Sequence, residues 1–220
     1  MPVSPIQLII FIFLLGFLLS IIQVGALTIA FEKLGLSQGS AFLLLFSSLF
    51  GSAVNLPLFS IKAEQPDLSN VPERFRAMVE EAMKRFNGRT VVAVNAGGCL
   101  IPLTFSVYLM EHHPLSPVQV ISAIALVAAI SYFASRPMPG LGIAMPIFVG
   151  PVAAALVAMA IGKENSAPLA YICGTLGVLI GADLLRLGDI RRMGTPTASI
   201  GGAGTFDGIF ITGIVAVLLA

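Results

Sequence analysis

Seven long apolar runs make up most of this chain and constrain its fold more than any other feature of the sequence. A run of about 20 apolar residues is long enough to cross the hydrocarbon of a bilayer as a helix. The expected spans are residues 5–30, 39–61, 90–110, 117–135, 141–162, 168–187 and 205–220. Because lipid offers no partner to backbone groups, every span is expected to be a helix. The sequence therefore predicts an all-α, polytopic membrane bundle.

The composition agrees with this class. Of the 220 residues, 57% are hydrophobic and 10% are charged, a charged share far below that of soluble domains. We expect one integral membrane domain, residues 1–220, with the lipid bilayer as its partner. The net charge of +1 gives no electrostatic basis for a nucleic-acid partner. Cys99 and Cys173 lie inside apolar runs and are interpreted as small buried residues. No metal ion and no cofactor is expected.

The basic residues lie almost entirely in connections that fall on one side of the predicted spans. That side holds the N-terminus and the loops 62–89, 136–140 and 188–204. Its ten basic residues are Lys62, Arg74, Arg76, Lys84, Arg85, Arg89, Arg136, Arg186, Arg191 and Arg192. The opposite side holds Lys33 and Lys163. The positive-inside rule then predicts a multi-pass protein of the cell membrane, with its N-terminus cytoplasmic and its C-terminus outside.

The longest of these loops, residues 62–89, contains an amphipathic segment, "SNVPERFRAMVEEAMKRFNG". Apolar residues recur at helical spacing between charged ones, and Asn87 with Gly88 supplies a stop signal. The pattern predicts an amphipathic helix over residues 70–86. Such a helix either lies on the cytoplasmic membrane surface or packs on the spans as a structural lid.

Four polar side chains lie inside apolar runs, in the third of the bilayer nearest the cytoplasm. They are Asn55, Asn95, Asp183 and Asp207. Asp183 comes late in a span directed inward, and Asp207 comes early in the next span, which is directed outward. Consecutive helices are usually neighbours, so we expect the two carboxyl groups at one depth. Polar groups are costly in a bilayer and mark functional sites there, and the four side chains predict a shared interior site.

Glycines surround Asp207, with Gly202 and Gly204 before it and Gly208 after it. They let backbone or substrate approach the carboxyl group closely, so all three are interpreted as backbone parts of the site. Two structural alternatives remain. Asp207 can start its helix as a capping residue, and Asp183 can pair with Arg186 three positions later.

The span 168–187 also carries glycines at positions 174, 177 and 181, along one narrow side. Such a side permits close packing of helices. An ideal helix points Asp183 to the opposite side. The span therefore either contacts neighbours on both sides or unwinds near Gly181.

Two carboxyl groups held close together in a low-dielectric site cannot both ionise easily. One keeps a proton, and the pair can activate water and protonate a leaving amide. At this point the chain resembles the intramembrane aspartyl proteases of the presenilin and signal-peptide-peptidase kind. "GAGTFDGIF" (residues 202–210) resembles their Gly-x-Gly-Asp motif, and "PVAAAL" (151–156) their Pro-Ala-Leu element. The resemblance implies Asp183 and Asp207 as the catalytic pair, with a transmembrane peptide as substrate.

The sequence departs from that motif in three places. Thr205 and Phe206 stand between the glycine and Asp207, "GAD" replaces the usual Tyr-Asp, and Pro151 precedes both aspartates. As a whole the chain is more similar to an uncharacterised prokaryotic family of multi-pass membrane proteins. The segments that carry this similarity are "AFEKLGLS", "NLPL", "VNAGGCLIPL" and "APLAYICGTLGVLIGADLL".

Two further functions stay open. Intramembrane Asp and Asn also bind cations or relay protons, and the prolines of residues 137–151 suggest an interrupted helix of the kind that ion-coupled transporters use. Asp183, Arg186 and Asp189 at i, i+3 and i+6 also fit a metal-dependent enzyme acting on a lipid phosphate.

Overall fold

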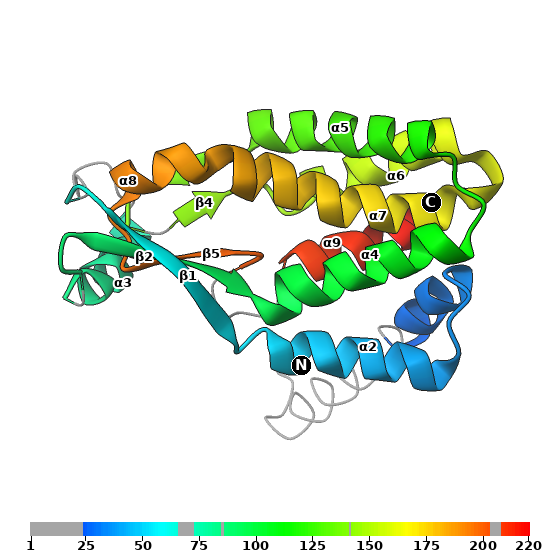
Figure 1. Cartoon of the computed structure of the whole chain (residues 1–220), viewed down its shortest axis with the longest axis horizontal. Helices are drawn as coiled ribbons and strands as arrows, with labels where there is room; N and C mark the ends of the chain where they lie inside the picture. The colour runs from blue at the N-terminus through cyan, green and yellow to red at the C-terminus, as the bar shows by residue number, and fades with distance from the viewer. Residues whose placement is uncertain (1–23, 66–72, 85, 141, 203–207) are drawn as a thin grey trace, which may run out of the picture.

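The chain forms a helical bundle with a small β-sheet at one end, as the computed structural model in Figure 1 shows. The structure describes residues 24–65, 73–84, 86–140, 142–202 and 208–220. The bundle consists of α4 (Ile101–His112), α5 (Pro117–Ala134), α6 (Val149–Gly162), α7 (Ser166–Val178) and α9 (Gly208–Leu219). The helical segment Val24–Lys33 and α2 (Gln38–Gly51) lie beside it. The predicted all-α bundle is confirmed as a mostly helical protein, which also contains two small β-sheets.

Helix α7 is the centre of the bundle and packs against α4, α5, α6 and α9. A Cβ atom on Gly177 would lie 2.7 Å from the Cβ of Val127, and one on Gly181 would overlap the carbonyl oxygen of Ala128. These two positions thus let α5 approach α7 closely. Gly174 instead faces α6 and α9, at Ala154 and Ala216. The helix therefore has neighbours on both of its sides.

Two of the apolar runs are not helical along their whole length. In the run 39–61, helix α2 ends at Gly51 and strand β1 (Asn55–Lys62) follows. In the run 90–110, strand β2 (Arg89–Asn95) and a π-helical turn precede α4. The prediction that every apolar run is a helix is therefore wrong for both.

The physical reason is local sequence and pairing. Pro57 disfavours a helix across its position, and "TVVAV" at 90–94 is rich in β-branched residues that fit strands. Strand β1 pairs antiparallel with β2, and β2 pairs in parallel with β5 (Thr197–Ile200), so the ladders satisfy the backbone groups.

The proline-rich segment before α6 is also not an interrupted helix. It forms a hairpin of β3 (Arg136–Met138) and β4 (Gly142–Ala144), and α6 begins at Val149. The span predicted over 141–162 is thus helical in its second part. The prolines give turn and extended backbone here, not a kinked helix.

Two helical stretches, Pro117–Ala134 and Val149–Met193, are long and apolar enough to cross a membrane. The second includes a turn at Lys163, after which α7 packs back on α6. Segment Val24–Lys33 and α2 make a third candidate if that pair, bent by 110°, is counted as one broken span. Within the described residues this supports a membrane protein, and seven spanning helices are not shown.

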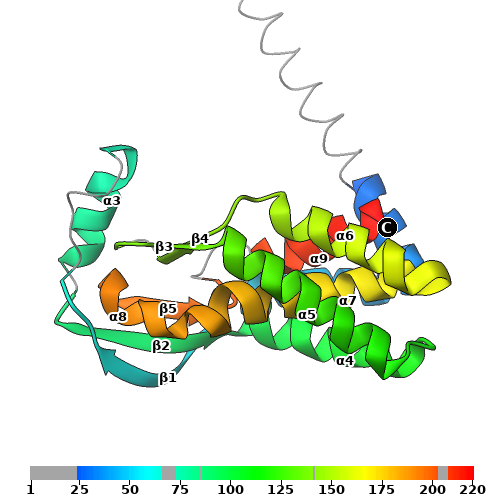
Figure 2. The ribbon, with the colours of Figure 1, turned by 90° about the horizontal axis from the view of Figure 1, so that it is seen from above.

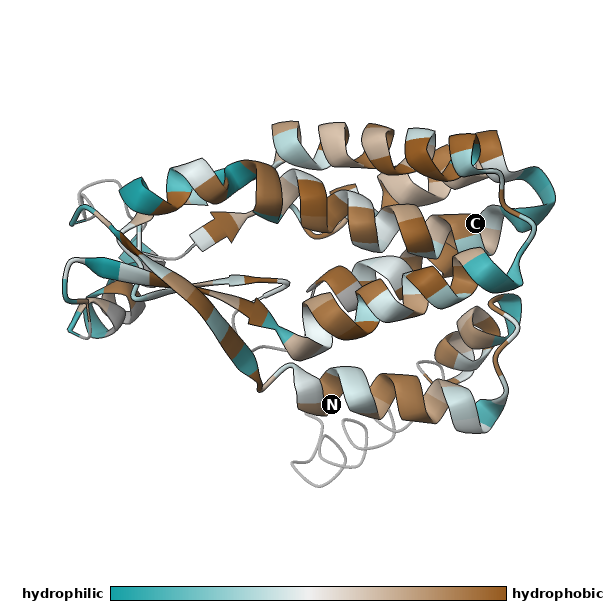
Figure 3. Ribbon diagram, in the orientation of Figure 1, coloured by the Kyte–Doolittle hydropathy of each residue, from teal (hydrophilic) through white to brown (hydrophobic). Residues whose placement is uncertain are grey.

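The polar residues gather at the two ends of the bundle, with apolar residues between them (Figure 3). One end holds the sheet, the β1–β2 connection and α8 (Ile190–Met193). At the other end, the ammonium group of Lys33 donates hydrogen bonds to the carbonyl oxygens of Val217 (3.3 Å) and Leu218 (3.5 Å) at the end of α9. A cation at a helix C-terminus is favourable. The described parts of the loops 62–89, 136–140 and 188–204 thus lie at the sheet end, and the side of a membrane that they face stays a prediction.

Within the segment predicted as an amphipathic helix over 70–86, the structure has helix α3, Glu73–Met83, while residues 70–72 and 85 lie outside the described residues. Val79 on this helix is completely buried, and it lies where a Cβ on Gly140 would be. Gly140 belongs to the turn between β3 and β4, and Figure 2 shows α3 beside this hairpin. This contact favours a helix packed on the rest of the protein over one that lies on the membrane surface alone.

We therefore predict that Val79→Ser loosens α3. The substitution removes an apolar side chain from a closed contact, which costs about 1–3 kcal/mol, so backbone amides of residues 73–83 should exchange with deuterium several-fold faster. Ala77→Ser, on the exposed side of the same helix, serves as the control. Equal exchange in both variants would mean that the membrane surface, not Gly140, holds the helix.

Candidate functional site

Asp183 lies where helix α7 loses its regular geometry. The α-helix ends at Val178, a π-helical turn covers Leu179–Asp183, and a 3₁₀ helix covers Leu184–Asp189. π-helical turns are rare and are frequent at functional sites. The extra residue of the turn changes the direction of Asp183 relative to the glycine side of α7. Of the two sequence alternatives, the first is confirmed, because α7 has neighbours on both sides. Near Gly181 the chain does not unwind but continues with π-helical geometry.

The carboxylate of Asp183 accepts a hydrogen bond of 2.8 Å from the backbone N–H of Gly201. Gly201 directly follows β5 and has a φ of +87°, which side chains with a Cβ rarely adopt. A Cβ there would also lie 2.6 Å from the Cβ of Cys99. This position therefore requires glycine. Its hydrogen bond links the end of β5 to the π-helical turn that follows α7.

Asp183 also lines a cavity of about 140 Å³ between the two sheets. Strand β5 forms one wall and β4 contributes Gly142 and Ile143. Apolar side chains and Gly202 complete it; the full lining is Gly142, Ile143, Asp183, Leu187, Ile190, Met193, Thr197, Ala198, Ser199, Ile200 and Gly202. A carboxylate thus lines a space with both polar and apolar walls, to which two strands contribute.

Asn55 and Asn95 meet each other, as the shared depth predicted. They are cross-strand partners in β1 and β2, and the amide of Asn95 donates to the side-chain oxygen of Asn55 at 3.1 Å. Asn95 also donates to the carbonyl oxygen of Ser52 and accepts from the N–H of Gly98. Ser199 of β5 donates to Asn55 at 2.5 Å. The amides therefore join the three strands, and Ser199 connects them to the cavity of Asp183.

The second predicted carboxylate, Asp207, lies outside the described residues, as does Gly204. Gly202 is a lining residue of the cavity, and Gly208 is the first residue of α9. Helix α9 packs against α7. The chain segment before Asp207 therefore reaches the cavity of Asp183, and the segment after it belongs to the bundle.

The alternative pairing of Asp183 with Arg186 is not found. The guanidinium group of Arg186 instead contacts the carboxylate of Asp189 at 3.2 Å and donates to the carbonyl oxygens of Tyr132 (2.7 Å) and Ser135 (2.9 Å). The Arg186 guanidinium group thus caps the C-terminal end of α5, as cations at helix ends commonly do. Arg186 and Asp189 are thus engaged with each other, and no cluster of three potential metal ligands occurs among the described residues.

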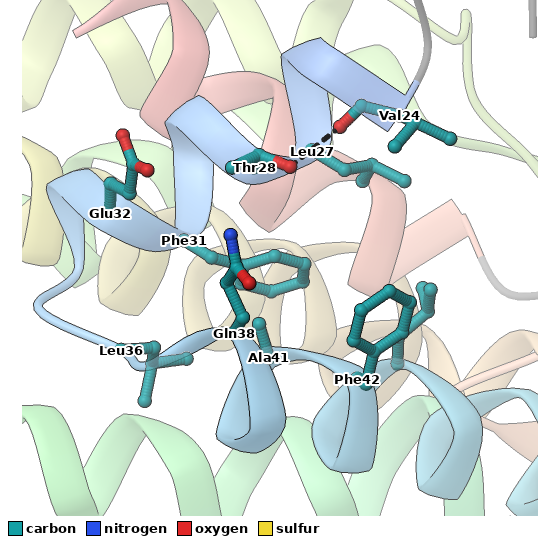
Figure 4. A pocket seen from close by; sticks show the side chains of 10 residues that line it. Val24, Leu27, Thr28, Phe31, Glu32, Leu36, Gln38, Ala41 and Phe42 are labelled. Atoms are coloured by element: carbon teal, nitrogen blue, oxygen red, sulfur yellow. Dashed lines mark hydrogen bonds between the residues drawn. The ribbon is translucent and has the colours of Figure 1, made fainter. Parts of the chain in front are cut away.

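A larger cavity, of about 330 Å³, lies between segment Val24–Lys33 and α2 (Figure 4). Its walls are mainly apolar, with Thr28, Glu32 and Gln38 among them. It contains none of the predicted site residues.

Residues 49–219 match the family of proteins of unknown function DUF1614. The chain belongs to the DUF1614 family. This confirms the predicted membership of an uncharacterised family, and it adds nothing to the resemblance to aspartyl proteases. No curated protein and no solved structure matches the chain.

Sequence reasoning missed β5 and β4 as walls of the cavity in this DUF1614 protein. A signal for β5 was present: Thr197 and Ile200 lie in a short extended segment between Pro196 and two glycines. The apolar hairpin residues Gly142 and Ile143 had been assigned to a helix. Ser199 of β5 lies close to Asn55 of β1 because both strands pair with β2, which lies between them. No local pattern encodes pairing between segments so far apart in the chain.

We predict that Gly201→Ala separates β5 from Asp183. The new methyl group would be strained by the positive φ and would overlap Cys99, which together cost about 2–4 kcal/mol. Thermal unfolding of the purified protein should show a clear loss of stability. Gly188→Ala is the control, because a Cβ on Gly188 has no atom within 4 Å. Equal melting temperatures for both variants would contradict the proposed closeness of β5 and Asp183.

Proposed function

We propose that this protein is an intramembrane aspartyl protease-like enzyme in which Asp183 and Asp207 form the catalytic pair. The observation that carries the proposal is the hydrogen bond from Gly201 to Asp183, at the edge of a cavity. It brings Asp183 to the chain segment that leads into Asp207, six residues after Gly201.

The chemistry follows from two carboxyl groups that share one proton. The ionised carboxylate takes a proton from water while the oxygen of that water attacks the carbonyl carbon of the peptide. The protonated carboxyl group gives its proton to the leaving nitrogen as the C–N bond breaks. The products are a carboxylic acid and an amine, and the pair again holds one proton.

The strands beside the cavity suggest how a substrate is held. Strand β5 pairs with β2 along one edge, and β4 pairs with β3 along one edge. Residues of both strands line the cavity of Asp183. An extended peptide can add to a sheet edge through backbone hydrogen bonds. We therefore expect the substrate to be a transmembrane peptide that unwinds at the sheet end of the bundle.

The expected orientation puts this site near the cytoplasmic face. The sheet end carries the basic connections, and Lys33 lies at the opposite end with the C-terminus. By the positive-inside rule the sheet end would face the cytoplasm, with the N-terminus cytoplasmic and the C-terminus outside.

One observation favours a second function, an ion- or proton-coupled transporter. Asp183 lies at a break between helical geometries, and broken helices with a carboxylate are typical of cation sites in transporters. In that case the same aspartates would bind a cation or a proton instead of acting on a peptide.

A peptide-like inhibitor with a secondary hydroxyl in place of the scissile amide distinguishes the two functions. The hydroxyl imitates the tetrahedral intermediate between two carboxyl groups, so a photoreactive version should label the purified protein in nanodiscs. Asp183→Asn and Asp207→Asn should each reduce labelling at least about tenfold, since either change removes one hydrogen-bond partner of the hydroxyl.

Asp189→Asn is the matched control, because Asp189 pairs with Arg186 and is not part of the cavity lining. It should label like the parent protein. Labelling that neither aspartate substitution changes would contradict the protease proposal. Absence of labelling, together with a cation-dependent thermal shift lost in Asp183→Asn, would favour the transporter.

A further inference from the structure

A further cavity of about 340 Å³ lies between the three-stranded sheet and the 3₁₀ helix with α8, and it shares Leu187 and Ile190 with the cavity of Asp183. The sheet contributes Phe59, Ile61 and Val92, and the 3₁₀ helix and α8 contribute Leu187, Gly188, Ile190 and Arg191. None of the predicted site residues lines it.

The sheet wall is apolar because of strand register. Phe59 and Val92 are cross-strand partners, and Ile61 lies two residues further on the same face of β1. The opposite wall is also apolar, apart from Arg191. The side chain of Arg191 is exposed, and none of the ion pairs found among the described residues involves it. The guanidinium group of Arg191 is therefore the charged group at an otherwise apolar cavity.

Further cations lie at this end of the sheet. Lys62 and Arg89 face each other across β1 and β2, a like-charge pair that is unfavourable without an anion nearby. The backbone N–H of Glu64 donates to the carbonyl oxygen of Arg191 at 2.8 Å, so the end of β1 lies beside α8. Glu64 is exposed and takes part in none of the described ion pairs. Arg192 adds a further positive charge.

We propose that this cavity binds an anionic phospholipid, with an acyl chain between the sheet and α8 and the phosphate against Arg191. An apolar cavity beside cations matches the two parts of such a lipid. Two helical stretches are long and apolar enough to cross a membrane, and that membrane would supply the lipid at high local concentration. Lys62 and Arg89 lie on the other face of the sheet and act through their field, each strengthening the attraction at short range.

Lipid retention by the full chain tests this inference. The purified protein is mixed with equal amounts of phosphatidylglycerol and phosphatidylcholine, and bound lipids are counted by native mass spectrometry. The parent protein should retain phosphatidylglycerol in preference. Arg191→Gln should weaken that retention about fivefold, as should the pair Lys62→Gln with Arg89→Gln, and the effect of the pair should diminish in high salt.

A second variant tests the acyl part without a change of charge. A Cβ on Gly188 meets no atom within 4 Å, so Gly188→Leu can extend into the cavity without a backbone clash. It should reduce retention of phosphatidylglycerol at least about fivefold, because each buried CH₂ group of the chain contributes to binding. Gly39→Leu, at another open glycine, should have no effect.

Arg136→Gln controls for total charge, because Arg136 is exposed and does not line this cavity. It should leave retention unchanged, and each variant should melt like the parent protein. An equal loss in Arg136→Gln and Arg191→Gln would overturn the proposal in favour of a diffuse charged surface. Displacement of the lipid by free glycerol phosphate would overturn it in favour of a phosphate site. Unchanged retention in Gly188→Leu would exclude the acyl chain from this cavity.

Discussion

The hydrogen bond between Gly201 and the carboxylate of Asp183 connects the two parts of this structure. Asp183 lies in the π-helical turn that continues α7, the helix that contacts most of the bundle. Gly201 directly follows β5, which pairs with β2 and so belongs to the three-stranded sheet. A partly buried carboxylate needs hydrogen-bond partners, and here a backbone N–H supplies one. The sheet is thereby held at one end of the bundle, and the cavity beside Asp183 exists because of that position.

Part of this arrangement could be predicted from the sequence. The apolar runs identified the bundle helices, and α5 begins and ends within a residue of the span predicted over 117–135. Helical spacing of apolar and charged residues identified α3. The polar residues Asn55 and Asn95 were expected to meet, and they do. Each of these inferences rested on a local pattern or on the cost of a polar group in lipid.

The remaining features depend on pairing between distant segments. A run such as "VNLPLF" is apolar enough for a membrane helix, and its strand geometry is stabilised by β2, more than 30 residues later. Parallel pairing of β2 with β5 spans a still longer separation. Spacing alone allowed Arg186 to pair with Asp183 as an alternative, whereas Arg186 in fact binds Asp189 and the carbonyl groups at the end of α5. Composition and periodicity carry no information on such competition.

The central claim is that Asp183 and Asp207 share one cavity, and a carboxyl-to-carboxyl distance tests it directly. The chain contains four aspartates, so Asp67→Asn with Asp189→Asn leaves this pair alone to carry ¹³C-labelled aspartate. Solid-state NMR of the protein in lipid should then detect a ¹³C–¹³C coupling between the two carboxyl groups, at a separation of about 6 Å or less, the reach of one bridging water. The ¹⁵N label of Gly201, which donates to Asp183 at 2.8 Å, is the internal reference. A clear Gly201 coupling without any coupling between the carboxyl groups would contradict the account.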